Sequence, residues 1–158
     1  TLHTNSAPET ITRLLDMGMD PFNFADALLG VLAQRLVRTL CKDCKEAYHP
    51  SREEYDVLVR SYDGDFGALG FNYNSDFVLY RPKGCPKCTN TGYRGRTGIH
   101  EIIVGTDPLK SLIQGRAKMD EIREQAIKDG MTTLMQDGVR KTLVGMTDLI
   151  QVRKVCIK

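Results

Sequence analysis

The chain has 158 residues, which is enough for one domain with a hydrophobic core of its own, or for one domain with a small satellite. Its hydrophobic content of 41% and charged content of 27% are those of an ordinary globular protein, and a net charge of +2 does not by itself indicate a nucleic-acid or membrane partner. No apolar run has the length of a transmembrane segment. No charged-then-apolar leader opens the sequence, so we expect a cytoplasmic location, where disulfides are uncommon.

The chain opens with a polar segment, Thr1 to Asn5, that no methionine precedes, and we expect it to start within a larger protein. The Thr, His, Thr and Asn side chains of this segment all form hydrogen bonds, which suits a phosphate or a catalytic water as well as an ordinary helix-entry loop. Ser6 and Glu9 then have the spacing of a capping box, which predicts a short helix.

Leucines recur three and four residues apart before the first cysteine, at Leu28, Leu29, Leu32, Leu36 and Leu40. This spacing predicts an amphipathic helix of about five turns that ends at Cys41. Arg35 and Arg38 would lie on its other side, where charged side chains are most simply solvated.

Two CxxC pairs, Cys41 with Cys44 and Cys85 with Cys88, are the strongest chemical signal in the sequence. Four thiolates at this spacing suit a tetrahedral zinc ion, because each pair lets two sulfurs converge from a tight turn. Disulfides and a thioredoxin-like redox pair are the alternatives. A redox CxxC would open a helix after a strand, whereas Cys41 ends a predicted helix and Cys85 lies among Gly and Pro, so zinc is favoured.

The other candidate ligands are less well placed. His49 lies five residues after Cys44 and could replace a cysteine as a ligand. His100 is most simply a sheet residue. Cys156 stands alone near the end of the chain and is most simply a small apolar residue in a last helical turn.

The insert between the cysteine pairs begins with a capped helix at Ser51, and a Gly/Asp/Asn/Ser-rich loop follows over residues 61–74. We expect this loop to be the most disordered part of the chain. The apolar runs Phe77–Tyr80 and Ile99–Val104 are of strand type, and we expect them to pair as an antiparallel ribbon with the metal at its turn.

The last third of the chain is predicted to be helical. Caps, prolines and glycines divide it into helices that begin at Asp107, Asp120, Thr133 and Thr147. Their apolar faces predict a small helical bundle.

The segment around the second cysteine pair is basic, with Arg81, Lys83, Lys87, Arg94 and Arg96. These cations suit the charge near −2 of a zinc ion bound by four thiolates. Base-stacking aromatic residues are sparse among them, so we expect no direct nucleic-acid binding. The glycine-rich run within this segment, residues 92–98, suits either a tight connection into a strand or an anion-binding nest.

The sequence lacks the parts that would make it an enzyme by itself. It contains no GxxxxGK[ST] phosphate-binding loop and no apolar strand that ends in an acidic pair for a magnesium-bound water. No Ser/His/Asp or Cys/His nucleophile set is visible. We therefore expect the chain to catalyse nothing when it is alone.

Several segments together resemble one known family. Thr1–Asn5 resembles the histidine box of the secretion ATPases, and Leu29–Arg38 resembles the segment that follows that box. The two CxxC pairs, the run Gly92–Glu101 and the run Gly130–Leu134 continue the resemblance in order. The chain thus resembles the type II secretion and type IV pilus assembly ATPases of the general secretion pathway protein E kind, and Ser51–Asp76 matches least.

The resemblance implies a helix-rich α/β fold, the distal part of a RecA-like P-loop ATPase domain, with a tetracysteine zinc subdomain and a C-terminal helical bundle. Residues 1–40 would belong to the ATPase core, 41–98 to the zinc subdomain, and 99–158 to a strand with a C-terminal helical subdomain. Such proteins are hexamers that bind ATP and Mg²⁺, work at the cytoplasmic face of the inner membrane through platform proteins, and drive assembly of a pilus or pseudopilus.

The resemblance also implies roles for individual residues. His3 would lie near the terminal phosphate of ATP, with Thr4 and Arg35 as further nucleotide contacts. Cys41, Cys44, Cys85 and Cys88 would hold one structural Zn²⁺. The alternative to such a fragment is a free-standing zinc-ribbon interaction module without enzyme activity.

Overall fold

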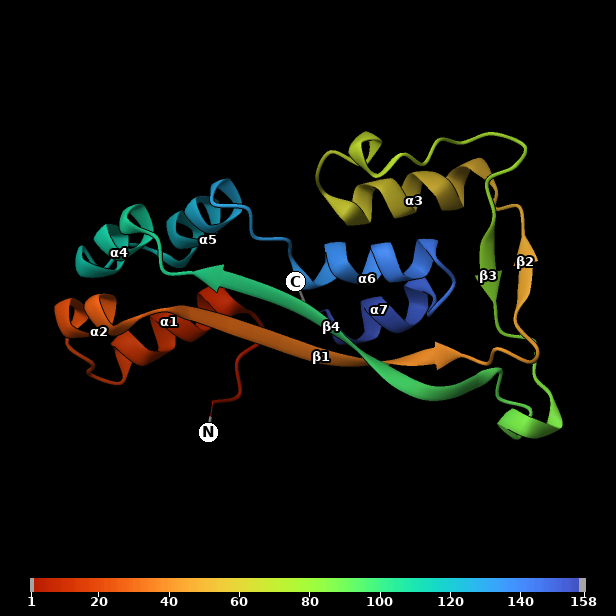
Figure 1. The fold of residues 1–158 in the computed structure, drawn as a ribbon, viewed down its shortest axis with the longest axis horizontal. Helices are drawn as coiled ribbons and strands as arrows, with labels where there is room; N and C mark the ends of the chain where they lie inside the picture. The colour runs from red at the N-terminus through yellow and green to blue at the C-terminus, as the bar shows by residue number, and fades with distance from the viewer. Residues whose placement is uncertain (1, 157–158) are drawn as a thin grey trace. The chain divides into compact units, whose positions relative to one another are not determined.

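The computed structural model describes residues 2–156, so Thr1 of the predicted histidine box lies outside the described residues. In chain order the elements are α1 (Ala7–Asp16), α2 (Pro21–Ala27), β1 (Gly30–Leu40), β2 (Glu46–Tyr48), α3 (Arg52–Tyr62), the 3-10 helix η1 (Gly67–Leu69), β3 (Leu79–Arg81), the 3-10 helix η2 (Pro86–Cys88), β4 (Tyr93–Val104), α4 (Asp107–Gln114), α5 (Met119–Lys128), α6 (Leu134–Leu143) and α7 (Leu149–Val155) (Figure 1). The fold is therefore mixed α/β and rich in helix, as the sequence predicts.

The chain forms two compact units, each built from two separate stretches. Unit 1 contains the residues up to Gln34 together with His100–Leu134, and unit 2 contains Arg35–Ile99 together with the residues from Met135 onward. Both β1 and β4 pass from one unit into the other, so each unit holds a part of both strands. The domain boundaries expected from the motifs, after residues 40 and 98, differ from the boundaries of these compact units and stay a prediction.

The predicted helix over the leucine run is wrong, because Gly30–Leu40 is the strand β1. β1 pairs with β4. The N–H of Gly105 donates to the carbonyl of Leu29 at 2.9 Å, and at the other end the N–H of Cys41 donates to the carbonyl of Gly92 at 2.9 Å, so the strands run antiparallel. Burial along β1 accordingly alternates from one residue to the next, as it does when one face of a strand is covered.

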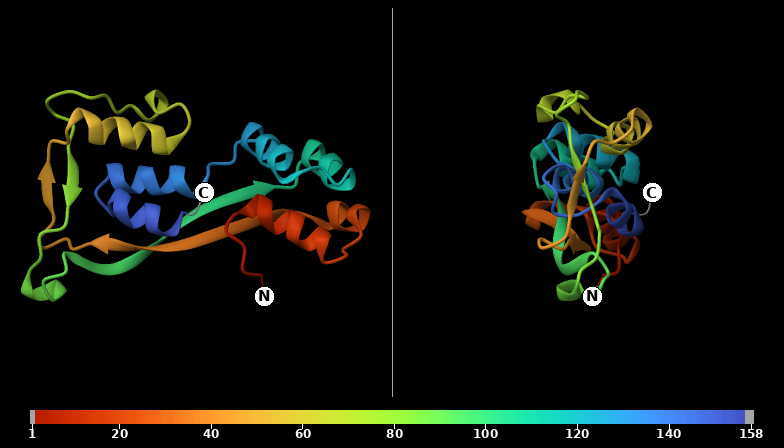
Figure 2. Two further views of the ribbon diagram at one scale, coloured as in Figure 1. Left: turned by 180° about the vertical axis from the view of Figure 1, so that it is seen from behind. Right: turned by 90° about the vertical axis from the view of Figure 1, so that its right-hand side faces the viewer.

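The expected partner of the strand near Phe77 is also wrong. β3 pairs antiparallel with β2, with Glu46 opposite Arg81 and Tyr48 opposite Leu79. The strand after the second cysteine pair, β4, pairs with β1 instead. The strands β1 and β2 flank the first cysteine pair, and β3 and β4 flank the second (Figure 2). Each sheet therefore pairs one strand beside the first cysteine pair with one strand beside the second.

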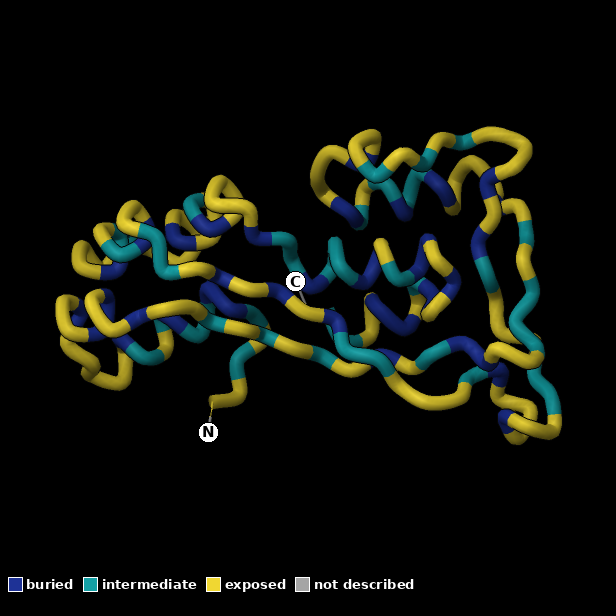
Figure 3. Tube along the Cα trace, viewed as in Figure 1, coloured by how far each residue is buried: buried dark blue, intermediate teal, exposed yellow. Residues whose placement is uncertain are grey.

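Unit 1 is a layer of helices packed on part of the β1–β4 sheet. Ser6 begins α1, because its Oγ accepts a hydrogen bond from the N–H of Glu9 at 3.3 Å, and Thr106 caps α4 in the same way at 3.4 Å. The buried core of this unit consists of Ala7, Ile11, Leu15, Phe24, Ala25, Leu28, Ile103, Leu109, Ile113, Ile122, Ala126 and Met131. Figure 3 shows buried positions, in dark blue, along the helices of this unit. Burial of these side chains holds the four helices against the inner face of the strands.

The segment 61–74, which the sequence predicts to be a disordered loop, is packed: its first two residues complete α3, and η1 lies within it. Its aromatic side chains join Tyr55 of α3: the ring centroid of Phe66 lies 5.7 Å from that of Tyr55, and the centroid of Tyr73 lies 5.1 Å from it. Phe66 is only 5% exposed. Aromatic packing therefore orders a segment whose polar composition favours a mobile loop.

The predicted helices of the last third are confirmed as α4, α5, α6 and α7. α6 and α7 come into close contact at Gly138, where a Cβ would lie 2.3 Å from Cγ1 of Val152. Val139 and Leu143 of α6 join the aromatic residues of α3 in the core of unit 2. α6 thus contributes two side chains to that core, and its glycine, which has no side chain, allows α7 to approach closely.

Candidate functional site

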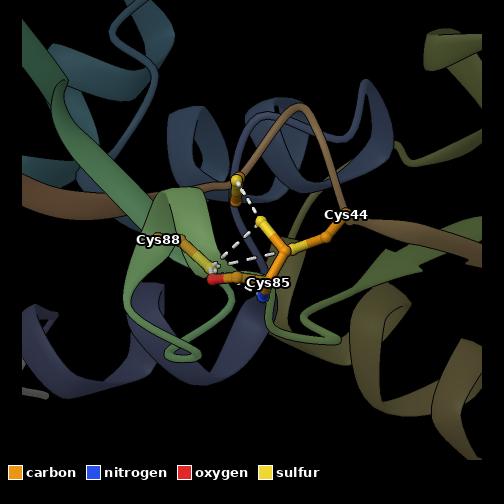
Figure 4. A group of neighbouring side chains, drawn as sticks. Cys44, Cys85 and Cys88 are labelled. Carbon is orange, nitrogen blue, oxygen red and sulfur yellow. Dashed lines mark hydrogen bonds between the residues drawn. The ribbon is translucent and has the colours of Figure 1, made fainter.

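The four paired cysteines come together in unit 2, where two tight turns present them. Cys41 follows β1 directly, and the N–H of Cys44 donates back to the carbonyl of Cys41 at 3.3 Å. On the other side the 3-10 helix η2 closes the second turn, with the N–H of Cys88 donating to the carbonyl of Cys85 at 3.1 Å. Figure 4 shows the sulfur atoms of Cys44, Cys85 and Cys88 pointing toward one another.

The sulfur positions fit a tetrahedral metal ion. The four Sγ atoms lie within 4.8 Å of one another. Three of the six sulfur–sulfur distances are 3.9 Å from Cys41 to Cys85, 3.8 Å from Cys44 to Cys88 and 3.7 Å from Cys85 to Cys88. Four zinc–sulfur bonds in a tetrahedron place the sulfurs about 3.8 Å apart. All four thiols are free, so the structure favours metal binding over the disulfide alternative.

Backbone N–H groups support the sulfur of Cys88. The N–H groups of Cys85 and Gly92 both donate to it at 3.2 Å. Gly92 has φ of +75°, a left-handed conformation, and a Cβ on it would lie 2.3 Å from the Cβ of Pro82. Only glycine therefore fits the position whose N–H reaches this sulfur.

The acidities of two of these thiols are shifted in opposite directions. Burial, helped by hydrogen bonds with the neighbouring thiols and opposed by a hydrogen bond with the backbone of Gly84, raises the pKa of Cys44 to about 11. Burial also opposes ionisation of Cys88, but the N–H groups of Cys85 and Gly92 outweigh it and lower the pKa of Cys88 to about 6. A zinc ion at this position would deprotonate all the cysteines that it binds.

Most of the basic residues near the second cysteine pair are paired with two carboxylates from the first turn region. Lys87 Nζ lies 2.7 Å from Asp43 Oδ1, and this hydrogen bond is the main reason that the pKa of Asp43 is lowered. Lys83 Nζ lies 2.6 Å from Glu46 Oε1 and lowers the pKa of Glu46 in the same way. Arg94 approaches Asp43 within 3.9 Å. These cations are therefore shared between the thiolate cluster and the acidic side chains beside it.

His49, which the sequence offered as an alternative ligand, is not part of the cluster, and neither are His100 and Cys156. His49 Nε2 is bonded to the carbonyl of Asn74 at 2.9 Å, and its ring lies 5.3 Å from that of Tyr73. His100 lies in β4, as expected of a sheet residue, and Cys156 lies at the end of α7. Over residues 2–156, the cysteine quartet is the group of His, Cys and acidic side chains that could hold a metal ion.

The predicted nucleotide contacts lie elsewhere. His3 is exposed in the segment before α1. The hydroxyl groups of Thr4 and Thr10 form a hydrogen bond of 2.6 Å. His3 and Thr4 belong to unit 1, whereas Arg35 is the first residue of unit 2 and is half-buried on β1. The side chain of Arg38 lies over the ring of Tyr93, 4.9 Å from its centroid. Of the predicted nucleotide contacts, His3 and Thr4 thus belong to unit 1 and Arg35 belongs to unit 2. Arg38 has an aromatic contact that the sequence did not suggest.

The glycine-rich run 92–98 is mostly strand. Tyr93 to Gly98 form the first half of β4, and Thr39 of β1 bonds to the carbonyl of Arg94. This pairing supports the tight connection rather than the anion-binding nest.

Sequence reasoning missed two groups of functional interest. Asp43 and Glu46 form ion pairs with the basic residues near the second cysteine pair. Their position inside and just after the first CxxC pair could have indicated this role. Glu101 is buried, at 5% exposure, although it is a carboxylate. The pattern of a charged residue between the apolar Ile99 and Ile103, which are fully buried in β4, could have indicated it.

The fold and the cysteine cluster define a class of protein: an α/β chain in which two tight turns bring together four cysteines that could hold a metal ion. In the described residues 2–156, no helix is both long enough and apolar enough to cross a membrane.

The particular family follows from comparison with known proteins. Residues 1–154 match the type II/IV secretion system protein family, and the chain belongs to it. It is 44% identical over 155 residues to the type II secretion system ATPase E of Vibrio cholerae. It is 43% identical over 152 residues to the type IV pilus assembly ATPase PilB of Thermus thermophilus, and 42% identical over 155 residues to PilB of Pseudomonas aeruginosa.

The chain spans only part of these relatives. The matched stretches cover 98%, 96% and 98% of this chain, but only 28%, 16% and 26% of the three relatives.

The resemblance inferred from the histidine box, the CxxC pairs and the glycine-rich run is confirmed.

Proposed function

We propose that the chain is the distal part of the ATPase domain of a secretion or pilus-assembly motor, which couples ATP hydrolysis to growth of a pseudopilus or pilus. The observation that carries this proposal is the family match over residues 1–154, together with relatives that are named as ATPases of both systems. In this proposal residues 1–40 belong to a RecA-like core, 41–98 form the zinc subdomain, and 99–158 form the C-terminal helical part.

The metal site has a structural role in this proposal. Cys41, Cys44, Cys85 and Cys88 hold one Zn²⁺, which three sulfur–sulfur distances of 3.7 to 3.9 Å support. Four protein ligands leave no open position for water or substrate, so the ion staples the two turns together and takes no part in hydrolysis.

The nucleotide chemistry belongs to the longer protein. ATP and Mg²⁺ would be bound chiefly by a phosphate-binding loop outside this chain, with His3 near the terminal phosphate and Thr4 and Arg35 as further contacts. The assembly is a homohexamer in the cytoplasm, held at the inner membrane by platform proteins. The exposed position of His3 supports a contact with a ligand or with residues beyond this chain.

ATP hydrolysis by the full gene product tests the proposal. We expect the full protein to hydrolyse ATP, this chain alone to be inactive, and His3→Ala in the full protein to lower kcat by about a hundredfold, the usual effect of losing a group that stabilises charge in the transition state. A gene without a phosphate-binding loop in the couple of hundred residues before Thr1 would overturn the proposal and leave the free-standing zinc-ribbon module.

A further inference from the structure

Glu101 is a buried carboxylate at the start of the unit 1 part of β4. Its neighbours His100 and Ile102 face outward, whereas Glu101 is only 5% exposed and lies on the inner face between Ile99 and Ile103. Burial of a carboxylate is costly unless hydrogen bonds replace its water. The two oxygens of Glu101 must therefore have partners inside the fold.

Both partners are backbone N–H groups at helix starts. Oε1 of Glu101 accepts from the N–H of Ala7 at 2.6 Å, and Oε2 accepts from the N–H of Leu134 at 3.0 Å. Ala7 and Leu134 are the first residues of α1 and α6. The first N–H groups of a helix have no partner within the helix, and the positive end of the helix dipole favours an anion there. One side chain thus fixes two helix starts.

The first of these helix starts also holds the segment that contains His3. The N–H of Asn5 donates to Oε2 of Glu9 at 2.7 Å, and the hydroxyls of Thr4 and Thr10 are bonded at 2.6 Å. Thr4 and Asn5 are therefore tied to the first turn of α1, and His3 directly precedes them. Any shift of that turn moves these residues with it.

The second helix start marks the place where the chain leaves unit 1. Leu134 is the last residue of that unit, and α6 continues into unit 2. The N–H groups of Ala7 and Leu134 donate to the same carboxylate. A movement of one helix start that shifts this carboxylate therefore also shifts the acceptor of the other helix start.

We propose that Glu101 is a positioning residue for the histidine box. Its carboxylate fixes the start of α1, so that His3 and Thr4 are presented in one orientation, and it links this orientation to the chain segment that leads out of unit 1. The consequence for hydrolysis rests on the function proposed above for His3, whereas the positioning itself is a property of this chain.

Glu101→Gln tests the positioning, because the amide keeps the shape of the carboxylate but can accept with only one of its two arms. Hydrogen exchange is measured by mass spectrometry in the full protein, on peptides that span residues 3–10 and 131–137. We expect exchange at the start of α1, of α6, or of both to become about tenfold faster, as loss of a hydrogen bond to a charged acceptor predicts. Unchanged exchange in both peptides would overturn the proposal.

Asp148→Asn is the matched control. Asp148 is also a buried carboxylate, 8% exposed, and also accepts from a helix-start N–H, that of Gln151 at 2.9 Å. It belongs to unit 2, so its replacement should leave the exchange of both peptides unchanged. Faster exchange of the 3–10 peptide in this control would show a general loss of stability and would overturn the specific role of Glu101.

ATP hydrolysis by the full protein supplies a second readout. We expect Glu101→Gln to lower kcat by about tenfold to a hundredfold and to leave KM for ATP unchanged, because a misplaced group loses rate while the rest of the site still binds. If His3→Ala has no effect on hydrolysis, the proposed function fails, but the exchange result still decides the positioning. If His3→Ala impairs hydrolysis and Glu101→Gln loosens α1 without any loss of rate, the positioning role is wrong.

Discussion

Tyr93 joins three elements of unit 2 through one side chain. Its hydroxyl donates a hydrogen bond to the carboxylate of Asp148, which caps the start of α7, and the guanidinium of Arg38 in β1 lies over its ring. Burial, and next the bond to Asp148, raise the pKa of Tyr93 to about 12. A residue at the entry to β4, just after the cysteine turn, therefore holds the strand pair to the last helix.

This geometry predicts a pH dependence of stability. A tyrosine whose pKa is raised in the folded state stabilises the fold fully below the unfolded value of about 10, and this stabilisation is lost as the pH rises through about 12. We expect Tyr93→Phe to lower the unfolding free energy by about 1 kcal/mol at neutral pH and to remove part of the loss between pH 10 and 12. Urea unfolding at several pH values measures both effects.

Tyr80→Phe serves as the control for the alkaline measurement, since it removes a tyrosine hydroxyl from the same unit but leaves the Tyr93 bond to Asp148 in place. It should keep the stability loss that Tyr93→Phe diminishes. Identical pH profiles for the wild type and Tyr93→Phe would contradict the assignment of this step to Tyr93.

At the scale of elements, the leucine run provides a direct test of strand against helix. Val37 is 1% exposed and Leu36 is 51% exposed, as alternate residues of a half-buried strand should be. We expect Val37→Ala to lower the unfolding free energy by about 1.5–3 kcal/mol, and Leu36→Ala by less than about 0.5 kcal/mol. Denaturant unfolding of the two variants gives the comparison. The predicted helix would reverse the order, because Leu36 belongs to its apolar face and Val37 does not.

The error over this run has a physical origin. Leu28, Leu32 and Leu36 recur every four residues, which fits one face of a helix but equally one face of a strand, because four is a multiple of the two-residue strand period. The choice is made by pairing with β4, a segment far away in sequence, which a local pattern cannot contain. By contrast, the helices that begin at Ser6, at Ser51 and near Asp107 were predictable, because their caps and prolines act locally.

The same distinction separates the parts of the candidate site. The cysteine quartet was predictable from spacing, because each CxxC pair is a local turn, and the structure brings the four sulfurs together. The ion pairs of Asp43 with Lys87 and of Glu46 with Lys83 join segments about forty residues apart, and they follow from the β2–β3 pairing that the sequence did not reveal. Glu101 lay inside a motif that was recognised, but its partners Ala7 and Leu134 depend on the tertiary fold.

At the scale of the whole molecule, the two units have separate cores, and the cysteine cluster belongs to only one of them. The core of unit 1 is mostly aliphatic, with Phe24 as its aromatic member, and lies among α1, α2, α4 and α5, whereas the core of unit 2 is built on the aromatic residues around α3. The cysteine turns connect β1, β2, β3 and β4 within unit 2. A metal ion at the cysteines should therefore stabilise unit 2 and leave the core of unit 1 largely independent of it.

Removal of zinc tests this independence. We expect one zinc ion per chain by native mass spectrometry, its loss on chelation or in Cys88→Ser, and its retention in Cys156→Ser. Structural zinc sites are worth about 10–16 kcal/mol in small peptides, more than a domain's typical net stability, so the turns around residues 41–48 and 79–92 should exchange their amides rapidly once the ion is lost. α1 and α5 should keep their protection, because their buried side chains pack within the other core. Equal loss of protection in both units would mean that the metal holds the whole chain together, and a metal-free native protein would refute the zinc site itself.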